Sequence, residues 1–96
     1  MLETDLQKKC IAYLKSHKIY YLNIHGGAWG STGTPDLIVC IKGRFVAFEL
    51  KMGDATLRPD QKMHRNRIIK NQGLHYVPRT LVQFTEIVES LLQERN

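Results

Sequence analysis

Two carboxylates and a lysine near the middle of the chain have the types and spacing needed for metal-assisted hydrolysis of a phosphodiester. Asp36 begins one apolar run, and Glu49 and Lys51 end the next. A divalent cation held by carboxylate oxygens can activate a bound water and neutralise charge on a phosphate. A lysine beside it can orient the water or stabilise the developing oxyanion. We therefore take these three residues as candidate catalytic groups.

The two apolar runs, residues 36–41 and 44–51, are expected to pair as a β-hairpin. Only Lys42-Gly43 separates them, and a two-residue connection that contains glycine favours a tight turn. This turn would put Asp36 directly opposite Glu49, with Lys51 on the same face. Opposed carboxylates repel each other unless a cation lies between them. The alternative interpretation is a surface acid at the end of each strand, which is common.

The remaining elements follow from hydrophobic periodicity and from turn residues. Pro59 suits the first turn of a helix that Gly73 would end, and Thr80 with Gln83 forms a capping box for a final helix. The expected helices span residues 3–17, 59–71 and 81 onward, and the expected strands span 19–24, 36–41, 44–51 and 74–78. The core face of the last helix is expected at Leu81, Phe84, Val88, Leu91 and Leu92. This order predicts an α/β domain built on a small mixed sheet.

Size and charge narrow the class of protein. With 96 residues, we expect one domain over residues 1–96. The net charge is +5, and the acids gather near the C-terminus at Glu86, Glu89 and Glu94, so the rest of the chain is still more basic. This favours a polyanionic partner such as nucleic acid, although a solvated basic surface explains the charge equally well.

Several other features predict where the protein acts and what it lacks. Cys10 and Cys40 lie in apolar segments and are expected to be small buried hydrophobes. No apolar run reaches the length of a membrane span, and the N-terminus does not resemble a signal peptide. The histidines have no zinc-ligand spacing, so no structural metal is expected. We also expect no small-molecule cofactor. We expect a soluble, intracellular protein.

The candidate residues also carry a resemblance to a known family. Gly33-Thr34-Pro35-Asp36 followed by Glu49-Leu50-Lys51 resembles the PD-(D/E)xK nuclease signature. The details are most similar to the virus-type replication-repair nuclease (VRR-NUC) family, in which a helical Glu precedes G-x-P-D and E-x-K, and a Gln follows on the next helix. Glu3 and Gln61 match those two outer positions. Arg58 departs from the Ser or Thr expected before Pro59.

The resemblance implies a restriction-endonuclease-like αβββαβ core with an extra C-terminal helix. It implies a Mg²⁺- or Mn²⁺-dependent endodeoxyribonuclease, with metal ligands Asp36, Glu49 and the Leu50 backbone carbonyl, and with Glu3 completing the acidic site. Lys51 would be the catalytic lysine, and Gln61 would support the site through the lysine or a water. Stand-alone members resemble viral or bacterial enzymes that cut branched DNA in the bacterial cytoplasm. A homodimer could place two active sites on opposite strands of a four-way (Holliday) junction.

Substrate contacts are expected outside this catalytic set. The second helix carries Lys62, Arg65, Arg67 and Lys70, which could bind phosphates. Gly33 would allow the preceding loop to approach a phosphate, and Trp29, beside His25, could stack on an unpaired base or lie in a dimer interface. Two alternatives remain open: a non-catalytic DNA-binding module with the same fold, and the cleavage subunit of a restriction-like system.

Overall fold

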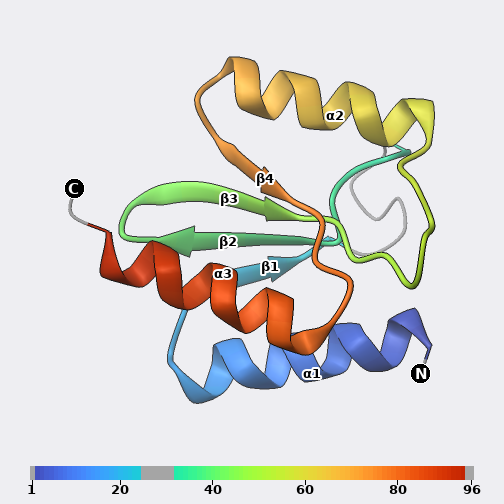
Figure 1. Cartoon of the computed structure of the whole chain (residues 1–96). Helices are drawn as coiled ribbons and strands as arrows, with labels where there is room; N and C mark the ends of the chain where they lie inside the picture. Colours follow the sequence, from blue (N-terminus) through green and yellow to red (C-terminus); the bar gives the residue numbers. More distant parts are fainter. Residues whose placement is uncertain (1, 25–31, 95–96) are drawn as a thin grey trace.

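The computed structural model describes residues 2–24 and 32–94, and its elements follow the predicted order (Figure 1). The predicted α/β class is confirmed, although most elements are a few residues shorter than their hydrophobic patterns. The elements are α1 (Glu3–Ser16), β1 (Tyr21–Asn23), β2 (Leu37–Ile41), β3 (Arg44–Phe48), α2 (Pro59–Lys70), β4 (Leu74–Tyr76) and α3 (Leu81–Gln93).

The four strands form one mixed sheet in the order β1-β2-β3-β4. β1, β2 and β3 are antiparallel neighbours, and β4 runs parallel to β3. The turn between β2 and β3 has positive φ at both central residues, 53° at Lys42 and 79° at Gly43. Positive φ at both central residues is typical of a type I′ turn, whose twist matches the twist of the two strands. Ile41 pairs with Arg44 as predicted. The register of the hairpin is therefore confirmed.

Two helices cover one face of the sheet, and the third lies along its β4 edge (Figure 1). α1 and α3 pack against each other and against the sheet, and their buried side chains meet those of the strands. Thr80 Oγ1 accepts a hydrogen bond from the Gln83 backbone N–H at 3.1 Å, so one half of the predicted capping box of α3 is present. The other half differs, because Gln83 Oε1 accepts from the Arg79 N–H at 2.8 Å rather than from the Thr80 N–H. The fully buried core residues include Leu6, Cys10, Leu14, Leu37, Val39, Val46, Phe48, Phe84 and Val88.

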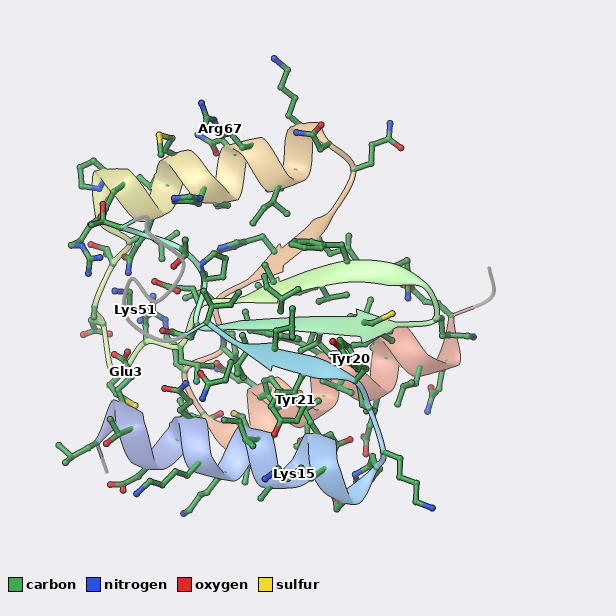
Figure 2. All side chains as sticks on the ribbon, turned by 180° about the vertical axis from the view of Figure 1, so that it is seen from behind. Glu3, Lys15, Tyr20, Tyr21, Lys51 and Arg67 are labelled. Atoms are coloured by element: carbon green, nitrogen blue, oxygen red, sulfur yellow. The ribbon has the colours of Figure 1, made fainter. Side chains whose placement is uncertain are left out.

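Two burial predictions are wrong. Cys40 is exposed, because the alternation along β2 points it to the face opposite Val39 and Ile41. No helix of the described residues lies in front of β2 on that face (Figure 2). Leu92 is 38% exposed, because adjacent helical residues point in different directions and Leu91 takes the inward position. Ile87 packs against the core in its place.

Within the described residues, none of the helices has the length and apolar character required to span a membrane.

The different environments of the two cysteines give a direct test of the fold. Burial raises the pKa of Cys10 to about 12, so both its low thiolate content and its inaccessibility slow reaction. We expect an aromatic disulfide reagent to modify one thiol of the native protein rapidly and the second only after unfolding. In Cys40→Ser, the rapid phase should disappear. A rapid phase that persists in this variant would show that Cys10 is accessible.

Candidate active site

The site lies where β2 begins and β3 ends. Asp36 comes just before β2, yet its backbone is held by both neighbouring strands. Its N–H donates to Phe48 O at 3.0 Å, and its carbonyl accepts from the Ile24 N–H at 2.9 Å. These two bonds fix the Asp36 backbone before its side chain makes any contact.

Beyond Phe48 the chain leaves the β2–β3 ladder. The last ladder pair is Leu37 with Phe48, one pair short of the predicted Asp36–Glu49 pair. The Glu49 N–H instead donates to Tyr76 O of β4 at 3.0 Å, and the Leu50 N–H donates to Asp36 Oδ2 at 2.8 Å. The Asp36 carboxylate is therefore directed at the backbone that follows Glu49, and the two acids still come together.

Glu49 is a buried acid beside a second acid. It is 3% exposed, and its Oε2 atom is buried without a hydrogen-bond partner among the described residues. Burial, and then the negative charge of Asp36, raise the pKa of Glu49 to about 8, while the positive charge of Lys51 acts in the opposite direction. A carboxylate oxygen buried without a donor is costly, so this atom is suited to bind a cation.

Gln61 connects Glu49 to the first turn of α2. Its Nε2 donates to Glu49 Oε1, and its Oε1 accepts from the Arg58 N–H at 2.9 Å. The backbone donor fixes the orientation of the carboxamide, because only the amide oxygen can accept from an N–H. The sequence predicted support through Lys51 or a water, whereas the structure shows a direct contact with the carboxylate.

The same contact accounts for the unusual residue at the start of α2. Arg58 occupies the N-cap position, and its side chain cannot accept a hydrogen bond from the helix. Gln61 supplies the reciprocal half of a capping box, and the Gln61 N–H is satisfied by Asp60 Oδ1 at 3.0 Å. Capping and support of Glu49 are thus performed by one side chain.

Gly33 makes a close approach, but to the protein itself. Its φ is +77°, and a Cβ at this position would lie 2.6 Å from the backbone carbon of Asp60. Among the described atoms, the close neighbour is therefore α2 rather than an open space for a phosphate. His64 Nε2 lies 3.0 Å from Thr32 O, a second contact between this segment and α2. The segment before Asp36 is consequently held against the helix that carries Gln61.

The remaining predicted residues occupy different positions. Lys51 is 9% exposed, and Glu3 is exposed in the first turn of α1; Figure 2 shows both at the same edge of the molecule. No group of three or more His, Cys, Asp or Glu side chains within residues 2–24 and 32–94 is placed to hold a metal. Glu3 is therefore not gathered with Asp36 and Glu49, and its role stays a prediction. Trp29 and His25 lie outside the described residues.

Comparison with known proteins gives a match in structure. No family model and no curated protein matches the sequence. A solved structure described as "VRR_NUC domain" superposes with a TM-score of 0.76 at 21% identity, covering 91% of this chain and 94% of that chain. This chain has the fold of a VRR_NUC domain. The resemblance that the motifs indicated is thus confirmed at the level of the fold.

Within this VRR_NUC fold, the oxygen donors fit a hard divalent cation. Glu49 Oε2 has no partner among the described atoms, and the neighbouring Asp36 carboxylate adds a second anionic group. Oxygen ligands of this kind suit Mg²⁺ or Mn²⁺. The Leu50 carbonyl stays a predicted third ligand.

Replacing Gly33 tests the contact between the segment before Asp36 and α2. Gly33→Ala would introduce both a strained φ and a clash with the Asp60 backbone, whereas Gly43→Ala would introduce the strained φ alone, because nothing lies within 4 Å of its Cβ position. The strain costs about 1–2 kcal/mol at either site. In urea unfolding, Gly33→Ala should lose at least about 1 kcal/mol more than Gly43→Ala, since repacking adds to the strain. Equal losses would contradict the close approach.

The raised pKa of Glu49 predicts how stability changes with pH in metal-free protein. Between the ordinary value of 4.5 and about 8, the folded state holds a proton at Glu49 that the unfolded state has released. Stability should therefore be greatest below pH 4.5 for this group and fall as pH rises toward 8, by at most about 1.4 kcal/mol per pH unit. Urea unfolding in EDTA measures this slope, and Glu49→Gln should flatten it. An unchanged slope in the variant would assign the dependence to another group.

Proposed function

We propose that this protein is a divalent-metal-dependent DNA endonuclease that hydrolyses phosphodiester bonds in branched DNA, such as four-way junctions, as a homodimer. The observation that carries the proposal is the buried Glu49 carboxylate beside the half-buried Asp36 and beside Lys51, with one Glu49 oxygen left without a donor among the described residues. A buried acid beside a second acid is costly, and a bound cation would offset that cost.

Each residue of the site has a proposed role. Asp36, Glu49 and the Leu50 carbonyl would hold Mg²⁺ or Mn²⁺, with Glu3 as a further ligand. When bound, the ion supplies a lowered pKa for a coordinated water and positive charge at the phosphate. Lys51 would orient that water or stabilise charge on the phosphate oxygens. Gln61 holds one oxygen of Glu49, so that the other is left for the cation.

The proposed substrate rests on charge, and the proposed oligomeric state rests on symmetry. The net charge of +5 and the cations of α2 favour binding to a polyanion. A two-fold dimer would present two equivalent active sites, which matches the two equivalent strands that must be cut to resolve a four-way junction. One chain alone would suit nicking of a flap or a single strand.

The test is cleavage of labelled four-way junction, flap, duplex and single-stranded DNA with Mg²⁺, Mn²⁺ or EDTA. We expect metal-dependent cuts on opposite strands of the junction. Glu49→Gln and Lys51→Gln should each reduce the rate about a hundredfold or more, because each removes charge from the site where charge develops. Light scattering of the same samples should give the mass of a dimer.

The matched control is Asp54→Asn, which removes an exposed carboxylate three residues after Lys51 and should cut at close to the wild-type rate. Junction binding without cutting under any metal would replace this proposal with a non-catalytic DNA-binding module. If a monomer cuts the DNA, the proposed nuclease activity is supported and the proposed homodimer is contradicted.

A further inference from the structure

The face of the sheet opposite α1 and α3 carries an apolar strip that α2 leaves uncovered. Figure 2 looks onto this face, with α2 along the β4 edge and no helix of the described residues in front of β1 and β2. Tyr20 is 68% exposed and Phe45 is 50% exposed, and a hollow of about 300 Å³ lies between them. We call this surface the open-face strip; it consists of Tyr20, Leu22, Ile38, Cys40 and Phe45.

The open-face strip begins at the active site. Side chains two apart on a strand share a face, so Asp36 is followed on β2 by Ile38 and Cys40. Phe45 lies four residues before Glu49, about 13 Å along the strand at about 3.3 Å per residue. A nucleic-acid strand whose phosphate is held at the carboxylates would therefore pass over this surface within a few nucleotides.

The Phe45 ring is positioned from the side of α2. A Cβ on Gly73 would lie 3.2 Å from Phe45 Cδ1, so the ring occupies the space that a side chain at residue 73 would need. Phe45 also borders a second hollow of about 360 Å³ that is lined by Arg67, Ile68 and Asn71. The ring thus lies between the hollow of the open-face strip on one side and the end of α2 on the other.

We propose that the open-face strip is a stacking surface for unpaired nucleobases next to the scissile phosphate, so that the substrate strand is single-stranded there, as in a flap or where base pairs open at the branch point of a junction. This rests on the proposed nuclease function and defines its substrate more closely. Exposed aromatic rings stack on bases of any sequence, while neighbouring cations bind the phosphates. Bases within a duplex are already stacked on one another. An intact DNA duplex would expose only the edges of its bases to the open-face strip, so the aromatic rings could not stack on them.

Charge favours a nucleic acid over a second copy of the chain on this surface. Along α2, the cations Lys62, Arg65, Arg67 and Lys70 outnumber the single acid Asp60, which is paired with Arg58. A second copy on this surface would cover the approach to Asp36 and Glu49, which the proposed dimer must leave open to DNA. A polyanion has the complementary charge and needs that approach open.

Binding in EDTA tests the strip without relying on catalysis. The probes are fluorescently labelled oligothymidylate and a duplex of the same length, read by fluorescence anisotropy. Phe45→Leu and Tyr20→Leu remove a ring but keep apolar bulk, so the fold should survive. Each should weaken binding of oligothymidylate about 5- to 150-fold, the range expected for one lost base stack, and leave duplex binding nearly unchanged. Phe45→Trp and Tyr20→Phe keep an aromatic ring at the same positions and should bind oligothymidylate about as tightly as the wild type.

The control is Val82→Ala, which trims an apolar side chain that is 63% exposed on α3 and should alter neither affinity. Unchanged oligothymidylate affinity in both Leu variants would overturn the proposal, as would equal losses on both probes. A dimeric wild type that becomes monomeric in Phe45→Leu would assign the strip to a second copy instead. If the wild type cuts the junction and the Leu variants bind oligothymidylate as the wild type does, the stacking surface is contradicted and the nuclease is not. If the Leu variants selectively lose single-strand binding but no DNA is cut, the nuclease is contradicted and the stacking surface is not.

Discussion

The hydrogen bond between Gln61 and Glu49 joins the two halves of the candidate site. Glu49 is placed by the sheet, since its N–H pairs with Tyr76 of β4, and Gln61 is placed by α2. Neither element alone could hold the carboxylate, because a buried acid beside a second acid needs a donor to offset its burial. Gln61 supplies that donor to one oxygen and leaves the other without a partner among the described residues. The position of α2 over the sheet therefore decides whether this pair of carboxylates can exist.

The position of α2 is in turn set by contacts with the segment before β2. Gly33 lies so close to Asp60 that no larger residue fits without movement, and His64 meets Thr32. The G-x-P-D segment thus has two physical functions within the described structure. It directs Asp36 into the site, and it fixes the helix turn that directs Gln61 to Glu49. The spacing of the motif reflects this contact between backbones as well as the chemistry of its acid.

Sequence patterns predicted most of the local structure, since local physics fixes it. The turn at Lys42-Gly43 and the period of two along each strand are enough to set the hairpin register. They could not show that Glu49 leaves the ladder for Tyr76, because that bond belongs to a parallel pairing between distant segments. Cys40 was misjudged for a related reason. Both faces of β2 are apolar in sequence, so alternation could not reveal which face has a helix over it.

The partner of Gln61 was beyond sequence reasoning for the same reason. A Gln at the third position of a helix predicts capping, and the capping bond is present, but its remaining donor could have pointed to a lysine, a water or a carboxylate. Only the packing of α2 against β4 selects Glu49. The sequence could not show which of the adjacent residues Leu91 and Leu92 of α3 points to the core. Neighbouring residues of a helix point in different directions, and it is Leu92 that is exposed.

The arrangement also explains why part of an apolar sheet stays uncovered in so small a chain. α2 must lie near the ends of β3 and β4 for Gln61 to reach Glu49, and a helix of twelve residues placed there cannot also cover β1 and β2. Exposed apolar surface carries a cost in water, and a second helix on this face would remove it. Such a helix would also close the approach to Asp36 and Glu49. In the proposed nuclease, leaving this face uncovered keeps a path to the two carboxylates open, and the aromatic rings of the open-face strip would bind the strand that takes it.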